Sequence, residues 1–226
     1  MATYKTPGVY VEEIPKLPPS IAQVETAIPA FIGYTEKAME LTPDDLLLKK
    51  PRRIGSLIEY EQFFGYGPSP SVTEINIDAN NNFLSASVNS SFYLYDSLRM
   101  FYANGGGDCF IVSVGKYDAT VSDASIIAGI TLLEKEDDPT IILTPDAVAL
   151  GDSALANVQV AALTQCNNLQ DRVSVLDLKE NDPKGVNFRN NVGVSYLSYG
   201  AAYTPWLKVA LPKAIRYTDI VKTPSV

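Results

Sequence analysis

Two aspartates stand where an active site on a β-sheet could form. Asp146 follows the apolar run "TIILTP", and Asp177 lies at the end of "RVSVLD". If both runs are parallel strands, both carboxylates lie at the carboxyl edge of the sheet, where active sites often form. Such carboxylates could serve a hydrolase or a metal-assisted enzyme. The structural alternative is an aspartate that caps a following helix or pairs with Arg172.

The remaining residue types restrict this chemistry. The chain has no histidine, which excludes a Ser-His-Asp triad, a Cys-His pair and a histidine-ligated zinc. Cys109 and Cys166 are predicted to be reduced, buried and inert. The glycines of Gly105–Gly107 precede an apolar strand, whereas a phosphate loop follows one, so we expect a tight turn there. We therefore predict no enzyme, with no catalytic residue, no cofactor and no metal.

Composition describes an ordinary globular protein and excludes two classes of partner. Of 226 residues, 46% are hydrophobic and 19% charged, and the formal net charge is −8. An acidic chain does not favour nucleic acid, because such binding requires clustered Lys and Arg. The basic run at 49–53 is expected to be a solvated loop. No apolar run approaches the roughly 20 residues that span a bilayer, so we expect no membrane insertion. We expect the chain to assemble in the cytoplasm.

The elements that would position these residues alternate between helix and buried strand. An apolar strand at 27–35 comes first, and three helix–strand pairs follow later in the chain. The predicted helices are 92–103, 123–136 and 153–169, and the strands after them are 108–115, 140–145 and 172–178. This alternation predicts an α/β fold with a mixed, largely parallel sheet and helices on both faces.

Smaller features fill the region between the first strand and these pairs. Residues 39–51 are polar and punctuated by proline, which predicts a loop. Ser56 and Glu59 form a capping box for a helix at 57–64, and Gly65 would end it. The stretch "SVTEINIDANNNFLSASV" alternates apolar and polar residues around an asparagine turn, which predicts a β-hairpin. We expect residues 39–88 to form a small inserted β subdomain.

The N-terminal segment "TYKTPGVYVEEIPKLPPS" reads as a strand without a partner of its own. Val9, Tyr10 and Val11 favour a strand, and the prolines of Pro15–Pro19 impose a stiff, extended exit. A tight hairpin to the next strand is therefore excluded. An unpaired strand would be an exposed edge, so we expect it to join the sheet of a neighbouring subunit by β-augmentation.

Four motifs resemble successive signatures of contractile tail sheath proteins, found in contractile phage tails, R-type pyocins and extracellular contractile injection systems. They are "TPGVYVEE", "FYANGGGDCFIV", "AALTQCNNLQDRVSVLD" and "AAYTPWLKV", in family order over nearly the whole chain. Two departures are present. Ser113 stands where the family often has arginine, and the chain stops at Val226, before the family's usual C-terminal domain and arm. We expect either an incomplete chain or a short relative.

The resemblance implies a structural subunit that polymerises in stacked rings around an inner tube and contracts to drive the tube through a membrane. It implies residues 1–20 as an extended arm with linker and 21–226 as the core domain. Its partners would be further copies of the chain, an inner tube protein, and baseplate and tail terminator proteins. The mature location would be a phage tail or a released injection particle. The implied inter-subunit arm is Tyr4, Pro7, Gly8, Val9, Tyr10, Val11, Glu12, Glu13 and Ile14, and the hinge is Pro15, Pro18 and Pro19.

Two alternatives remain open at this point. A baseplate or adaptor protein could use the same fold without contracting, and an α/β hydrolase-like enzyme would need a water-accessible carboxylate pair that includes Asp146 or Asp177. The aromatic cluster near the end of the chain (Tyr196, Tyr199, Tyr203 and Trp206) fits either a core or an interface.

Overall fold

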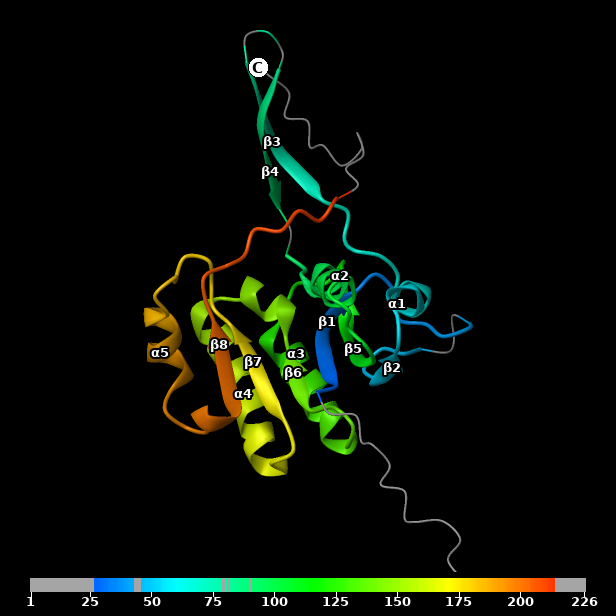
Figure 1. Cartoon of the computed structure of the whole chain (residues 1–226), viewed down its shortest axis with the longest axis vertical. Coiled ribbons are helices and arrows are strands. Elements are labelled where there is room, and N and C mark those ends of the chain that lie inside the picture. Colours follow the sequence, from blue (N-terminus) through cyan, green and yellow to red (C-terminus); the bar gives the residue numbers. More distant parts are fainter. Residues whose placement is uncertain (1–26, 43–45, 79, 81, 90, 214–226) are drawn as a thin grey trace, which may run out of the picture.

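The structure is a computed structural model that describes residues 27–42, 46–78, 80, 82–89 and 91–213 (Figure 1). The predicted arm at 4–14 and the hinge at 15–19 lie outside the described residues. The division of the chain into arm, core and inserted subdomain therefore stays a prediction.

A six-stranded sheet forms the centre of the molecule (Figure 1). Neighbouring strands pair in parallel, except for one antiparallel strand at an edge. In spatial order the strands are β2 (Arg52–Ile54), β5 (Cys109–Lys116), β1 (Pro29–Thr35), β6 (Ile141–Leu143), β7 (Val173–Asp177) and β8 (Gly200–Tyr203). The predicted α/β class with a mixed, largely parallel sheet is confirmed.

Helices cover both faces of this sheet, as predicted. One face carries α3 (Asp123–Leu132) and α4 (Asp152–Leu169), and the other carries α1 (Leu57–Phe64) and α2 (Leu94–Ala103). The fifth helix, α5 (Val186–Val192), packs against α4 beside β7. Three short 3-10 helices complete the elements: η1 (Leu133–Lys135), η2 (Pro145–Ala149) and η3 (Leu197–Tyr199).

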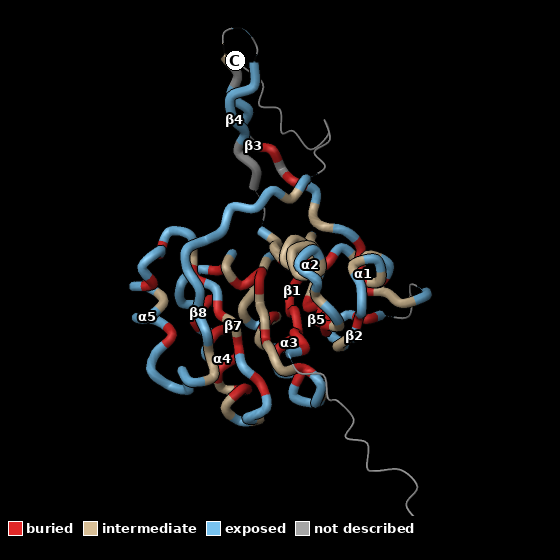
Figure 2. Tube along the Cα trace, in the orientation of Figure 1, coloured by how far each residue is buried: buried red, intermediate tan, exposed pale blue. Residues whose placement is uncertain are grey.

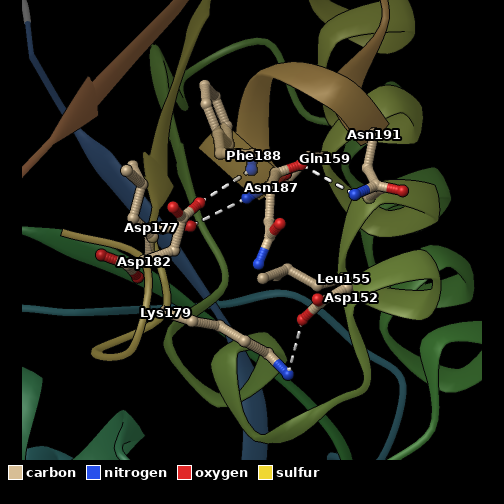
Figure 3. A pocket seen from close by; sticks show the side chains of 11 residues that line it. Asp152, Leu155, Gln159, Asp177, Lys179, Asp182, Asn187, Phe188 and Asn191 are labelled. Carbon is tan, nitrogen blue, oxygen red and sulfur yellow. Dashed lines mark hydrogen bonds and ion pairs between the residues drawn. The ribbon is translucent and has the colours of Figure 1, made fainter. Parts of the chain in front are cut away.

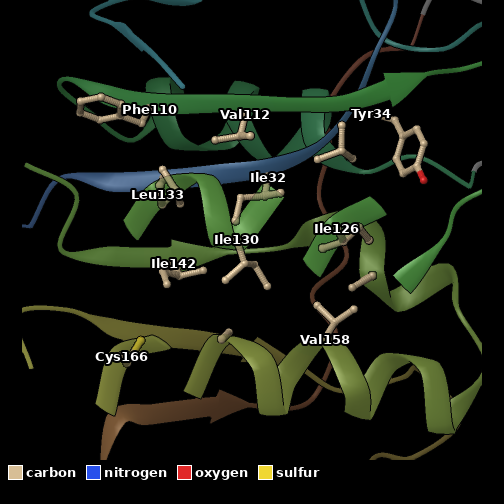
Figure 4. Packing of buried hydrophobic residues seen from close by; sticks show 14 of the residues in the cluster. Ile32, Tyr34, Phe110, Val112, Ile126, Ile130, Leu133, Ile142, Val158 and Cys166 are labelled. Atoms are coloured by element: carbon tan, nitrogen blue, oxygen red, sulfur yellow. The ribbon is translucent and has the colours of Figure 1, made fainter. Parts of the chain in front are cut away.

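Strand β1 shows why its sequence is apolar throughout. Side chains of a strand point alternately to opposite faces, so Ile32 and Tyr34 enter the core under α3 and α4, while Phe31 enters the core under α1 and α2. Figure 4 shows Ile32 between Val112 of β5 and Ile130 of α3. Every residue of β1 is buried. A strand covered on both faces therefore shows no alternation of polar and apolar residues.

Strand β2 corrects one prediction. Part of the basic run forms a three-residue edge strand antiparallel to β5, although a solvated loop was expected. The Arg52 guanidinium lies 4.8 Å from the centre of the Phe63 ring and 2.8 Å from the Glu40 carboxylate. Arg53 pairs with Asp108 at 2.7 Å. Because long arginine stems can cover apolar surface while their charged ends stay paired, basic residues are compatible with a short edge strand.

The predicted hairpin is present and extends away from the body of the molecule (Figures 1 and 2). It consists of β3 (Ser71–Ile77) and β4 (Phe83–Asn89), paired antiparallel. At the turn, the Asp78 carboxylate accepts hydrogen bonds from the backbone N–H groups of Asn80 and Asn82, both at 2.8 Å. Phe83 is 67% exposed. A two-stranded sheet of this kind is at best marginally stable without further contacts.

Candidate functional site

The first candidate carboxylate, Asp146, connects three elements of the fold through backbone hydrogen bonds. It is fully buried and accepts three backbone hydrogen bonds, from Tyr34 at 2.7 Å, Tyr93 at 2.5 Å and Leu94 at 3.0 Å. Burial raises the pKa of this carboxyl to about 6, and the three N–H donors oppose that rise. Asp146 therefore joins η2 to β1 and to the first turn of α2, and no substrate reaches it.

Asp146 therefore has a structural role, as the alternative to an active site predicted. The predicted partners, a following helix or Arg172, are wrong. Asp146 binds the start of a helix that precedes it in the chain, rather than capping a following helix. Arg172 pairs instead with Asp171 at 2.7 Å, and it donates to the backbone oxygens of Leu133 and Glu136, each at 2.8 Å. The contacts of Asp146, and those of Arg172 with Leu133 and Glu136, leave no pattern in the local sequence, because they join residues that are far apart along the chain.

Asp177 lies at the expected carboxyl end of β7. Its backbone oxygen accepts a hydrogen bond from the Gln159 side chain at 2.8 Å. The residue is exposed as a whole, yet desolvation by its surroundings raises the pKa of its carboxyl above the usual value. Asp146 is sealed from solvent, so the structure does not bring these two aspartates together as a water-accessible pair. A carboxylate pair made of Asp146 and Asp177 is therefore not formed.

A small cavity beside Asp177 gathers several polar side chains (Figure 3). Lys179 pairs with Asp152 at 3.1 Å. The Asp182 carboxylate accepts hydrogen bonds from the backbone N–H groups of Val186 at 2.8 Å and Phe188 at 2.9 Å, and so caps α5. The cavity measures about 20 Å³, which is room for about one water. Lys179, Asp152 and Asp182 thus bind each other or the backbone, as in a structural cluster.

The glycine turn and the cysteines also behave as predicted. Gly105 has a φ of +83°, a conformation that glycine adopts without strain, and the Gly106 N–H donates to the Phe101 oxygen at 2.9 Å. The turn therefore connects α2 directly to β5. Cys109 and Cys166 are buried free thiols, and burial raises the pKa of each to about 11. Neither is a reactive thiolate at neutral pH.

Within the described part of the chain, no group of three or more Cys, Asp or Glu side chains is placed to hold a metal ion. The helices that the structure describes include none long and apolar enough to cross a membrane.

The two edges of the sheet differ in a way that bears on partner binding. At one edge, β2 carries Arg52 and Arg53, both in ion pairs. At the other edge, β8 carries Gly-Ala-Ala-Tyr, without a charge, and pairs on one side with β7. Natural edge strands are usually protected from further pairing by charges, proline or a cover. The edge at β8 lacks such charges, and its last three residues are exposed.

The segment that follows this edge along the chain is exposed (Figure 2) and carries several apolar side chains. We define the β8 surface as strand β8 with the exposed side chains of Trp206 (39% exposed), Leu207 (78%) and Val209 (48%). Trp206 is held in place, because its Nε1 donates to the Leu178 oxygen at 2.6 Å and its ring lies edge-on to Tyr93 at 5.9 Å. An apolar cavity of about 300 Å³ opens beside these residues.

The aromatic cluster near the end of the chain thus favours an interface over a core. Tyr196, Tyr203 and Trp206 are exposed, and Tyr199 is partly buried against α4. Ser113 is buried, and its Oγ lies 2.6 Å from the Thr35 hydroxyl oxygen. The sequence predicted strand pairing at the N-terminal segment but did not identify β8 as an open edge, because edge position depends on which strands become neighbours.

Comparison with known proteins gives matches among solved structures. No protein-family model matches the chain, and no curated protein matches it. Among solved structures, the chain is similar to a chain of the anti-feeding prophage (AFP) baseplate, determined by cryo-electron microscopy with sixfold symmetrisation, with 23% sequence identity and a TM-score of 0.49. The likeness covers 89% of this chain and 46% of the other, so the chain spans about half the length of the protein it matches.

Proposed function

We propose that the chain is a structural subunit of a contractile injection particle, and specifically of its sheath. The observation that carries this proposal is the uncharged, exposed edge at β8, next to the exposed apolar side chains of Trp206, Leu207 and Val209. A solvent-exposed edge of this kind is a site for another strand. The same chain carries a strand-forming segment at 8–14 that its prolines separate from its own next strand. The arm of one subunit and the β8 edge of another are complementary.

The expected contact is modest for one subunit and large for an assembly. A four-residue edge such as β8 offers about four hydrogen bonds to an added strand, each worth about 0.5–1.5 kcal/mol net. Burial of Leu207 and Val209 under a neighbour would add an apolar contribution. Repeated around a ring and between stacked rings, such contacts would connect subunits while the globular bodies change their relative positions.

The order of the four sequence motifs supports a sheath. The carboxylates of Asp146 and Asp182 accept hydrogen bonds from backbone N–H groups, which supports a role without catalysis. In this proposal the partners are further copies of the chain, the inner tube protein, and the baseplate and terminator proteins at the ends of the sheath. The arm residues Tyr4–Ile14 make the inter-subunit strand, and the prolines Pro15, Pro18 and Pro19 make the hinge.

The test is negative-stain electron microscopy of the purified chain beside a Val9→Pro/Val11→Pro variant. Hollow cylinders or rings from the parent, and dispersed particles from the variant, are expected, because proline removes backbone donors from the added strand. Circular dichroism should show the same fold for both. Cylinders from the variant would refute pairing through the arm. Dispersed particles from both proteins would favour the adaptor or baseplate alternative. Binding of the purified chain at the end of an injection particle would favour the same alternative.

A further inference from the structure

A second surface lies at the base of the projecting hairpin. The connection between α1 and β3, the first turns of α2 and the C-terminal segment near Pro212 enclose a groove of about 500 Å³. Figure 1 shows the C-terminal segment passing α2 toward the base of the hairpin. We call this the tyrosine–proline groove, after its lining residues Tyr66, Pro68, Pro70 and Tyr95.

The backbone of Tyr66 and the side chain of Tyr95 are held by hydrogen bonds within the chain. The backbone N–H of Tyr66 donates to the Glu36 carboxylate at 2.7 Å, and its backbone oxygen accepts from the Tyr117 hydroxyl at 3.0 Å. Tyr66 as a residue is 60% exposed. The Tyr95 hydroxyl donates to Glu61 at 2.6 Å, and the Tyr95 ring lies where any side chain at Gly67 would stand. The groove therefore presents the fixed ring of Tyr95 beside an exposed tyrosine, Tyr66, whose backbone is anchored.

The opposite wall is closed by one hydrogen bond to the backbone and one ion pair. Arg99 donates to the Pro212 oxygen at 3.0 Å, and Lys213 pairs with Asp96 at 2.9 Å. The Arg99 guanidinium also lies 5.9 Å from the centre of the Tyr95 ring. Together with Glu36, these residues bring two positive and two negative charges to the lining, so the groove has no net charge and does not favour a strongly charged ligand. It favours one that offers apolar, rigid surface and few hydrogen-bond donors of its own.

A polyproline II segment has those properties. Its prolines give flat apolar surface at little cost in conformational entropy, and proteins that bind such segments use grooves lined by aromatic rings. This chain carries one P-x-x-P sequence, in the segment Pro15–Pro19, "PKLPP". The ligand chemistry that the groove favours is thus present in the chain itself.

The lengths involved favour insertion from a second copy. Glu36 lines the groove directly after β1, whereas Ala27 lies before the other end of that strand. Seven strand residues span about 23 Å. The eight residue steps from Pro19 to Ala27 span at most about 26–29 Å. The segment of the same subunit would therefore need full extension back along the whole sheet, whereas a subunit stacked head to tail would present its segment directly at the groove.

We propose that the tyrosine–proline groove binds the Pro15–Pro19 segment of a neighbouring copy. The inference rests on the proposed assembly of copies, and it assigns to the proline-rich hinge a docking site distinct from the β8 surface. The N-terminal segment would then contact its neighbours twice, by strand pairing through Val9–Ile14 and by ring contacts through Pro15–Pro19.

The test uses a fluorescently labelled peptide of residues 14–21, IPKLPPSI, which omits the strand-forming part of the arm. It is titrated against the full chain at concentrations where the chain sediments as a monomer, with fluorescence anisotropy as the readout. We expect saturable binding, weakened about tenfold or more by Tyr66→Ala, because an exposed ring supplies most of the contact. A peptide with Pro15 and Pro18 replaced by alanine should not bind.

Tyr203→Ala is the matched control, because Tyr203 is an exposed tyrosine of the β8 surface outside the groove. It should leave peptide binding unchanged, and circular dichroism should confirm that both variants are folded. Absence of saturable binding, equal binding by Tyr66→Ala, or loss of binding in Tyr203→Ala would each overturn the proposal. Peptide binding together with failure to form cylinders would refute the sheath function and leave the groove assignment standing.

Discussion

The Asp146 carboxylate receives the backbone N–H of Leu94 at 3.0 Å and thereby fixes the start of α2 against η2, 52 residues further along the chain. The same carboxylate receives the N–H of Tyr34, so one side chain joins the central strand to a helix on one face of the sheet. A buried charge costs free energy unless it is hydrogen-bonded. Here three backbone donors offset that cost at the junction of three elements.

Replacement of Asp146 should change how stability depends on pH. The carboxyl has a pKa of about 6 in the folded chain and about 3.8 in the unfolded chain, so the folded state binds the proton more tightly. Its contribution to the free energy of unfolding is therefore greatest below about pH 4. It falls by about 3 kcal/mol as the pH rises through 6.

Asp146→Asn removes this titration while it keeps the shape of the side chain. We expect the variant to be less stable than the parent at every pH, because its amide places a donor against backbone donors. The difference between the two should be larger at pH 4 than at pH 7. Urea unfolding of both proteins at several pH values measures it, and a difference that does not vary with pH would contradict the raised pKa.

Adding a side-chain carbon at Gly33 tests how closely β1 packs against Asp146 and α2. A Cβ at this position would overlap the Asp146 carboxylate and lie 3.3 Å from the Leu94 Cβ. We expect Gly33→Ala to lower the free energy of unfolding by about 1–3 kcal/mol, because two buried elements must move apart. Gly107→Ala is the control: nothing lies within 4 Å of a Cβ there, so the change should stay within about 0.5 kcal/mol. Equal effects of the two substitutions in chemical denaturation would argue against close packing at Gly33.

Much of the fold could be predicted because it depends on local pattern. The alternation of helix and apolar strand predicted the parallel sheet, and the Ser56 capping box predicted the start of α1, where the Ser56 hydroxyl accepts the Glu59 N–H at 3.2 Å. The asparagine turn likewise predicted the hairpin. In each case the determining residues lie within a few positions of each other.

The features that escaped prediction depend on contacts between distant segments. Strand β2 has three residues and exists through its pairing with β5, so its charged sequence resembles a loop. The partners of Asp146 lie between 52 and 112 residues away. The open edge at β8 follows from the final order of the strands, and the tyrosine–proline groove forms where α2 meets two connecting segments. None of these relationships leaves a periodic signal.

A charge placed on the β8 edge should block assembly. Ala202 is exposed in β8, and the arm predicted to pair there carries Glu12 and Glu13. Ala202→Glu would place a negative charge on β8 beside the two glutamates of the added strand. We therefore expect rings or cylinders to be lost while the monomer keeps its melting temperature. Ala128→Glu, on the exposed side of α3, is the matched control and should still assemble. Electron microscopy decides, and normal cylinders from Ala202→Glu would exclude the β8 edge as the acceptor.

Trp206 provides a direct optical measure of whether the β8 surface becomes covered. It is the one tryptophan of the chain, and 39% of it is exposed, while its Nε1 is held by the Leu178 oxygen. Covering the β8 surface would remove water from the indole, so we expect a shift of its emission to shorter wavelength and weaker quenching by acrylamide as assembly proceeds. The Val9→Pro/Val11→Pro variant should keep the emission of the monomer at every concentration. Assembly of the parent chain without any change in Trp206 emission would mean that subunits meet through another surface, and the arm would then require a different acceptor.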